Sequence, residues 1–190
     1  MGDVLDRTGR DDAPLTTSKD GDFAGGDRGN SLTGKTVTIN RPRGELYEFW
    51  RDFSNLPSFM DNIVSVEQLD GGRSHWVVKA PGDRTVEWTS TITEDRAGEV
   101  IAWTSEDGAD VPNSGRIEFR DAPGGRGTWV SATISYDPPG GVIGKIIAKM
   151  FQREPAIQAR RDLRRFKQLM ETGEVATAAW TRKQLDEEKA

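Results

Sequence analysis

Residues 139–173 read PGGVIGKIIAKMFQREPAIQARRDLRRFKQLMETG, and this stretch decides the fold that the sequence predicts. Its first half places an apolar set on one helical face: Val142, Ile143, Ile146, Ile147, Met150 and Phe151. Its second half does the same with Ile157, Leu163, Phe166, Leu169 and Met170. Pro155 lacks an amide hydrogen and fits only the first turn of a helix, so we expect a kink or a new helix near Arg153. Gly173 is typical of a helix end, and the stretch therefore predicts a long C-terminal helix with an apolar stripe to bury.

The charge of the chain is unevenly distributed. The net charge is −5, yet the segment 142–170 holds eight basic residues against two acidic ones, which leaves −11 for the rest. Such a helix is either a solvated face whose arginines pair with nearby carboxylates or a docking surface for anionic headgroups or an acidic partner. Nucleic acid is not expected as a partner, because the remaining surface would repel phosphate.

Composition excludes several kinds of chemistry. The chain has no cysteine, so disulfides and thiolate catalysis are excluded, and its one histidine cannot build a multi-histidine metal site. We therefore expect neither a metal nor a cofactor. The start, MGDVLDRTGRDD, lacks a signal-peptide pattern, and no apolar run reaches the roughly 20 residues that span a bilayer. The expected location is cytoplasmic.

Three regions are expected along the chain. Residues 1–34 are rich in glycine and aspartate and cannot bury enough apolar surface to fold, so they are expected to form a disordered arm. Residues 35–174 form the expected domain, and residues 175–190 are a polar tail. The domain begins with a strand over 35–40, in which Val37 and Ile39 face the core.

Two short helices are expected next. Asn40 and Pro42 form a helix-start signal, and Ser54 or Asn55 is the expected cap of a second helix that contains Pro57. The helices turn one apolar set inward: Leu46, Phe49, Trp50, Phe53, Leu56, Phe59 and Met60.

From Ile63 onward the hydrophobic period changes to two, which is typical of strands. Six strands follow, joined by short glycine-rich turns, and parallel pairing would need longer connections. The expected core side carries Val64, Val66, Trp76, Val78, Ala80, Val86, Trp88, Ser90, Ile92, Ile101, Trp103, Ile117, Phe119, Val130, Ala132, Ile134 and Tyr136. The opposite, wet face is expected to expose His75, Glu87, Thr104 and Trp129. The sequence therefore predicts an α+β fold in which a curved antiparallel sheet of seven strands is wrapped around the C-terminal helix.

This order of elements resembles the START-like helix-grip superfamily (SRPBCC), and within it the polyketide cyclase/dehydrase and coenzyme Q-binding START group. The resemblance covers about residues 35–174. It rests on INRPRGELYEFWRDFSNLPSFM after the first strand, on VEWTSTITEDRAGEVIAW in the central hairpin and on the closing REPAIQARRDLRRFKQLMETGEV. It implies a cavity between the sheet and the last helix that holds a small hydrophobic molecule, either lipid-, quinone- or polyketide-like.

The residues favour such a cavity independently, because rigid aromatic walls on a curved sheet are easier to leave hollow than an aliphatic core. The alternative is that these aromatic side chains simply form the core. The pocket is expected to be lined by Phe49, Trp50, Phe53, Phe59, Met60, Trp76, Trp88, Ser90, Trp103, Tyr136, Ile143, Ile147 and Phe151.

Catalysis is a second hypothesis, because relatives of the aromatase/cyclase or dehydratase type use polar pocket groups to assist proton transfer. The acid/base candidates are few, since His75 is expected on the wet face. Ser90 and Tyr136 point inward without a base beside them. The carboxylates Glu106 and Asp107, with Asp110 nearby, lie in a loop, where they usually serve the backbone. No residue matches a family active-site motif, so no catalytic residue is assigned. A third hypothesis is an interaction module that uses the basic helix.

The segment 140–151 is expected to act as a lid, because Gly140, Gly141 and Gly144 weaken a helix that must open. Lys145, Lys149 and Arg153 would lie on its outer side, beside the cavity mouth. Basic residues there would give a weak, transient contact with an anionic membrane surface.

Overall fold

The computed structural model describes residues 31–80, 82–136 and 155–175 of the chain. Seven strands form one antiparallel sheet in the order β1-β7-β6-β5-β4-β3-β2. The strands are β1 (Ser31–Ile39), β2 (Ile63–Gln68), β3 (Arg73–Ala80), β4 (Arg84–Arg96), β5 (Val100–Ser105), β6 (Asn113–Asp121) and β7 (Thr128–Tyr136). The helices are α1 (Arg43–Arg51) and α3 (Pro155–Thr172), with 3₁₀ turns η1 (Phe53–Ser58), η2 (Asp70–Gly72) and η3 (Pro123–Gly125). This is the expected α+β architecture, although β1 begins at Ser31 rather than at Lys35.

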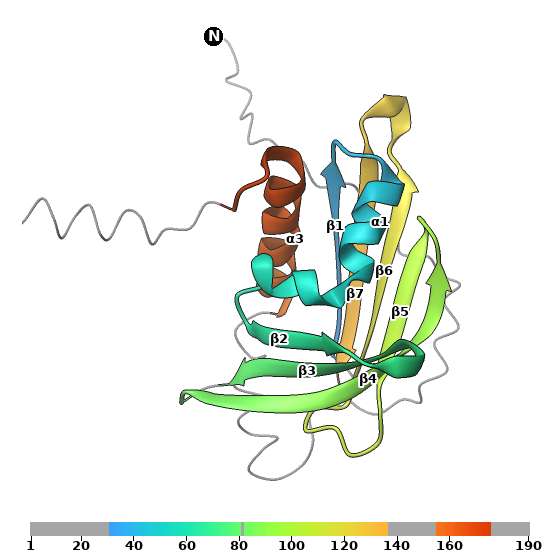
Figure 1. The fold of residues 1–190 in the computed structure, drawn as a ribbon. Coiled ribbons are helices and arrows are strands. Elements are labelled where there is room, and N and C mark those ends of the chain that lie inside the picture. Colours follow the sequence, from blue (N-terminus) through green and yellow to red (C-terminus); the bar gives the residue numbers. More distant parts are fainter. Residues whose placement is uncertain (1–30, 81, 137–154, 176–190) are drawn as a thin grey trace, which may run out of the picture.

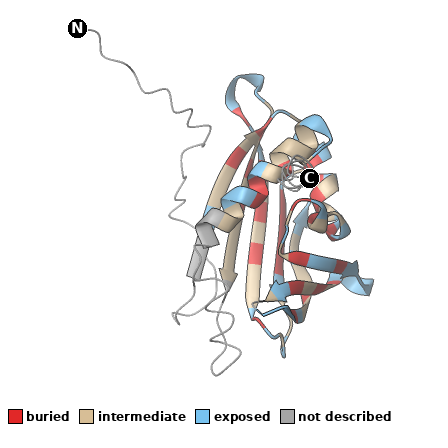
Figure 2. Ribbon diagram, turned by 90° about the vertical axis from the view of Figure 1, so that its left-hand side faces the viewer, coloured by how far each residue is buried: buried red, intermediate tan, exposed pale blue. Residues whose placement is uncertain are grey.

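The sheet curls so that β2, β3 and β4 run across the direction of β1, β7 and β6 (Figure 1). Both α1 and α3 lie on the concave side, with α3 along β1. A break in register between Ile92 and Glu94 interrupts the long strand β4, and such bulges increase the bend and twist of a strand. Buried residues recur along the strands and on the helix faces turned toward the sheet (Figure 2).

α3 is fixed to the rest of the fold at its C-terminal end. It begins at Pro155, as expected of a proline in the first turn, and ends before Gly173, whose φ of 80° is left-handed. Arg41 caps the helix from the β1–α1 turn, because its Nε donates to the carbonyl of Met170 at 2.6 Å. Leu163 and Phe166 are buried in the core, while Leu169 and Met170 pack partly buried against it.

The start of α1 is confirmed at Pro42, whereas the predicted cap of the second helix is wrong. Pro42, not Asn40, precedes the first turn of α1, and the backbone N–H of Asn40 instead donates to Glu171 at 2.7 Å. Asp52 caps η1 by accepting a hydrogen bond from the Ser54 backbone N–H. A carboxylate at this position accepts the same bond that a serine or asparagine cap would, so the cap is of the expected chemical class at a different position.

Two strands depart from simple alternation. In β2 a shift in register between Ile63 and Ser65 turns Val64 outward, so Ile63 and Val66 face the core in place of the predicted Val64 and Val66. In β5 the first four residues, Val100 to Trp103, are buried on both faces. Val100 and Ala102, on the outer face, lie between paired charged residues of β4 and β6.

The cover over β5 is a network of ion pairs. Arg116 binds both Glu94 and Glu118, with 3.2 Å to Glu118, and Arg96 reaches Glu94 at 3.0 Å. The register places Glu94 and Arg116 beside Ala102, and Arg96 and Glu118 beside Val100. The aliphatic stems of long charged side chains bury apolar surface while their ends stay hydrated. Val100 and Ala102 on the outer face are therefore shielded from water although their neighbours are charged.

Candidate ligand-binding face

Three tryptophans lie side by side on the concave face of the sheet with nearly parallel rings. We call Trp76, Trp88 and Trp103 the tryptophan rack. Trp76 pairs with Trp88 across β3 and β4, and their ring centroids are 6.2 Å apart at an interplanar angle of 9°. Trp76 and Trp103 are 6.1 Å apart at 16°. Trp76 and Trp103 are buried, but Trp88 is only half-buried, which is less than expected. The rack therefore gives one wall of parallel aromatic faces, with Trp88 at its more open end.

The position of Trp103 depends on a missing side chain. A Cβ atom added to Gly115, opposite Trp103 on β6, would lie 2.1 Å from the indole ring. The indole consequently lies flat against the backbone of β6, and Phe53 packs on it at 5.8 Å in an edge-to-face arrangement. The sequence pattern does not reveal this role of Gly115, because nothing local distinguishes it from a strand-weakening glycine.

A second aromatic group lies beneath the helices, and we call Phe49, Trp50, Phe59 and Phe166 the helix-side cluster. Phe166 of α3 lies 4.9 Å from both Trp50 and Phe59, and 5.9 Å from Phe49. Trp50, Phe59 and Phe166 are fully buried, while Phe49 and the neighbouring Met60 are partly buried. The predicted pocket residues thus separate into two groups, and Phe166, which the sequence places only in the helix stripe, fills the space between the rings of this one.

Polar groups on the concave face of β3 and β4 are few. Ser74 and Ser90 face each other across the two strands and are almost completely buried. The indole Nε1–H of Trp76 donates to Ser74 Oγ at 2.8 Å. Ser90 Oγ and Trp88 Nε1 are buried without a hydrogen-bond partner among the described residues. Serine hydroxyls and indole N–H groups are hydrogen-bond donors that do not ionise near neutral pH, so they suit binding better than acid/base catalysis.

His75 lies on the outer face, as predicted. Its side chain is 36% exposed and its Nε2 is 3.5 Å from Glu87 of the neighbouring strand. Glu87 and Thr104 are exposed, and Trp129 is half-buried between Thr38 and Arg120, which is less exposed than expected. The one histidine therefore does not face the tryptophan rack.

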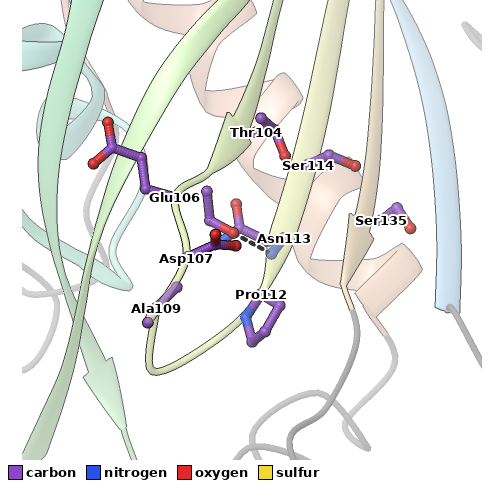
Figure 3. A pocket seen from close by; sticks show the side chains of 10 residues that line it. Thr104, Glu106, Asp107, Ala109, Pro112, Asn113, Ser114 and Ser135 are labelled. Atoms are coloured by element: carbon purple, nitrogen blue, oxygen red, sulfur yellow. Dashed lines mark hydrogen bonds between the residues drawn. The ribbon is translucent and has the colours of Figure 1, made fainter. Parts of the chain in front are cut away.

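Of the predicted loop carboxylates, Glu106 and Asp107 line a depression of about 290 Å³ at the β5–β6 turn (Figure 3). Glu106 points away from the other side chains there, and its carboxylate accepts hydrogen bonds from Arg73 Nε at 2.6 Å and from Thr91. The hydrogen bonds from Arg73 and then Thr91 lower the pKa of Glu106 to about 2. Asp110 accepts from the backbone N–H of Glu87 at 3.0 Å. Glu106 and Asp110 therefore hold the turn, and the depression is lined mainly by polar residues.

Several predicted site residues lie outside the part of the chain that the structure describes. They are Ile143, Ile147 and Phe151 of the predicted pocket, the predicted lid 140–151, and the predicted membrane contact of Lys145, Lys149 and Arg153. Tyr136 is the last residue of β7, and the direction predicted for its side chain stays a prediction.

Three basic residues of α3, in the part of the helix that the structure describes, pair with groups of their own protein. Arg165 binds Asp61 of the η1–β2 loop, and Arg161 lies 3.9 Å from the same carboxylate. Lys167 Nζ donates to the carbonyl of Thr38 at 2.8 Å. The alternative of a solvated helix face that pairs with loop carboxylates accounts for these contacts. In the described residues, no helix is long and apolar enough to cross a bilayer.

One carboxylate of α3 is unusual. Asp162 is buried, and burial raises its pKa to about 6 against the opposing effect of the hydrogen bond from Gln158. Gln158 Nε2 donates to both carboxylate oxygens, at 2.9 and 3.1 Å. Nothing in the sequence indicates this burial, because Asp162 lies within a run of arginines that is typical of an exposed face.

With the fold and this face established, the comparisons assign the chain to a class. The family described as polyketide cyclase / dehydrase and lipid transport matches residues 39–185. The chain therefore belongs to this family, and the resemblance inferred from the sequence is confirmed. No curated protein matches the chain.

Solved structures share the fold. The crystal structure of DR_A0006 from Deinococcus radiodurans is 42% identical, with a TM-score of 0.62, over 75% of this chain and 99% of that one. TTHA0849 from Thermus thermophilus is 22% identical, with a TM-score of 0.57, over 74% and 95% of the two chains. The Zhui aromatase/cyclase from Streptomyces sp. R1128 is 16% identical, with a TM-score of 0.58, over 78% and 100%. The last two show likeness of fold alone.

Proposed function

We propose that this protein binds a small hydrophobic molecule, lipid-, quinone- or polyketide-like, on the concave face of its sheet, and that it carries or sequesters this molecule rather than transforming it. The observation that carries the proposal is the tryptophan rack. Trp88 is half-buried on the concave face, and of the rings that the structure describes only Trp76 stacks on it. A large apolar face left partly free inside a curved sheet is typical of ligand sites.

The family supports the same class of ligand, since its description couples polyketide cyclases and dehydrases with lipid transport. The polar groups described beside the rack are hydroxyl and indole donors, which orient a ligand but supply no general base. A cyclase or dehydratase reaction remains the alternative, and it would need an acid/base residue other than the hydroxyl and indole groups beside the rack.

Native mass spectrometry tests the proposal. Protein purified gently from its own host should carry a co-purifying apolar small molecule, and Trp88→Ala should lose it. Trp129→Ala is the matched control, because Trp129 is a half-buried tryptophan on the opposite face of the sheet and should leave the complex intact. Retention of the molecule by Trp88→Ala, or its loss from Trp129→Ala alone, would contradict the placement of the site.

A further inference from the structure

Two neighbouring strands carry the same pair of residues on the concave face. β3 has Ser74 and Trp76 two positions apart, and β4 has Trp88 and Ser90 two positions apart. The antiparallel register sets serine opposite serine and tryptophan opposite tryptophan. The molecule therefore contains two serine–tryptophan pairs at matching positions of two paired strands, and their hydrogen bonds can be compared directly.

The two pairs differ in how their polar atoms are used. In β3 the two side chains bond to each other, because Trp76 Nε1–H donates to Ser74 Oγ at 2.8 Å, and we call them the closed pair. In β4 both Trp88 Nε1 and Ser90 Oγ are buried and have no partner among the residues that the structure describes. Ser90 has no exposed surface at all. The β4 pair thus has two buried polar atoms without a hydrogen-bond partner among the described residues, whereas the β3 pair has none.

Such an arrangement is unfavourable in the free protein. A buried donor without a partner loses its bond to water and costs roughly 1–3 kcal/mol. Trp50 Nε1 and Asn62 Oδ1 share this condition, but neither residue belongs to β3 or β4. The Trp50 ring is packed between Phe59 and Phe166, at 5.3 and 4.9 Å, and belongs to a filled core. Within the described residues, β4 is the strand on which two unpartnered groups lie two positions apart.

We propose that Trp88 Nε1–H and Ser90 Oγ–H are a polar subsite that binds the carbonyl oxygen of an apolar, ring-containing ligand. This inference rests on the proposed function and narrows it to ketones and quinones over plain hydrocarbons. An indole N–H can only donate, so its partner must be an acceptor. Positions two apart in a strand are separated by about 7 Å, so one oxygen between them accepts from both side chains or two oxygens of one ligand accept from one each.

The rack explains why the ligand should be flat. Aromatic faces stack with planar rings, and the Trp88 ring carries both an apolar face and the N–H group at its edge. A planar ketone lying against Trp88 would therefore bury its ring on the indoles and direct its oxygen to the strand. Both polar atoms are buried in the free protein, so binding requires the side chains that cover them to move aside.

Two probes of nearly equal shape isolate the hydrogen bond: fluorenone, which has one carbonyl, and fluorene, in which a CH₂ group replaces it. Isothermal titration calorimetry on the full chain should give a Kd for fluorenone about 10-fold lower than for fluorene, the change expected of one buried hydrogen bond. Ser90→Ala and Trp88→Phe should remove most of this preference, whereas Ser74→Ala in the closed pair should keep it.

Thermal unfolding of the free variants separates binding from folding. Ser90→Ala removes a hydroxyl without a partner and should leave the melting temperature unchanged or raise it, whereas Ser74→Ala leaves the Trp76 N–H unpaired and should lower it by a few degrees. Equal Kd values for the two probes in the wild type, or a preference that survives both Ser90→Ala and Trp88→Phe, would overturn the subsite while leaving a hydrophobic site intact. Binding of neither probe would contradict the proposed function itself, and the subsite with it.

Discussion

The helix-side cluster and the tryptophan rack are both aromatic, but they differ in how completely they are packed. Phe166 contacts three rings of the first group within 6 Å, and α3 is fixed there by Arg41 and Lys167. The rack lies on the sheet itself, and its end member Trp88 is only half-buried. The difference agrees with the division of roles that we propose, in which one group holds the helix to the sheet and the other binds the ligand. Aromatic content alone therefore does not identify a pocket.

The largest effect on stability is expected from removing the ring of Phe166, which completes the helix-side cluster. Phe166→Ala should lower the free energy of unfolding by about 3–5 kcal/mol, because it leaves a cavity among three rings of the cluster. Trp88→Ala should lower it by about 1–2 kcal/mol, since less of that side chain is removed from water. Denaturant titration of both variants measures the contrast. Equal losses would mean that the rack is as much a structural core as the cluster.

The next effect concerns the pH dependence of stability near α3. The folded pKa of Asp162 is about 6, above its usual value of 3.8, so its contribution to stability is complete below about pH 4 and is lost as the pH rises through 6. Asp162→Asn cannot ionise, so its stability relative to the wild type should rise by on the order of 2–3 kcal/mol between pH 4 and pH 7. Urea unfolding across this range is the measurement. If the difference in stability between Asp162→Asn and the wild type stayed constant with pH, burial would not destabilise the ionised carboxylate of Asp162. Arg165 and Arg161 would then offset its charge fully.

A third prediction tests the packing of the Trp103 indole against Gly115 of β6. Gly115→Ala places a Cβ atom on the indole and should destabilise the fold by about 1–3 kcal/mol, with a change in near-UV circular dichroism as the ring moves. Gly44→Ala is the control, because a Cβ atom at this position of α1 meets nothing within 4 Å and alanine favours a helix. If both variants have unchanged spectra and stability, the close approach of Trp103 to β6 is not a constraint.

The smallest effect is that of the cap on α3. Arg41 donates to the carbonyls of Met170 and Glu171, at 2.6 and 3.3 Å, and Arg41→Ala should cost about 1 kcal/mol of stability. Amide hydrogen exchange should quicken at the end of α3 and stay unchanged in the rack. Faster exchange at Trp88 would show that the two regions are coupled rather than separate.

Much of the fold could be predicted from periodicity. Alternation places Trp76 and Trp103 inside and His75 outside because a strand has a strict period of two, and Pro155 marks the first turn of α3 because a proline fits there. The errors arise where one residue shifts the pattern. The break in register after Ile63 and the cap at Asp52 depend on backbone geometry that composition does not encode.

The site is less predictable because it depends on contacts between distant residues. The sequence predicts both groups as one pocket, since nothing in it shows that Phe166 inserts among Trp50 and Phe59. The burial of Asp162 and the ion pairs over β5 likewise require the three-dimensional register. The inward direction of Ser90 follows from alternation. Alternation does not show that Ser90 and Trp88 lack the hydrogen bond that Ser74 and Trp76 form with each other.

Whether the ligand lies against Trp88 can be measured by an NMR titration of the six tryptophan indole N–H signals with fluorenone, each signal assigned by its own Trp→Phe variant. A ligand bound at the rack should cause large, saturable shifts for Trp88, smaller shifts for Trp76 and Trp103, and none for Trp50 in the helix-side cluster or Trp129 on the outer face. Shifts at Trp50 or Trp129 with the rack unmoved would contradict this placement of the ligand.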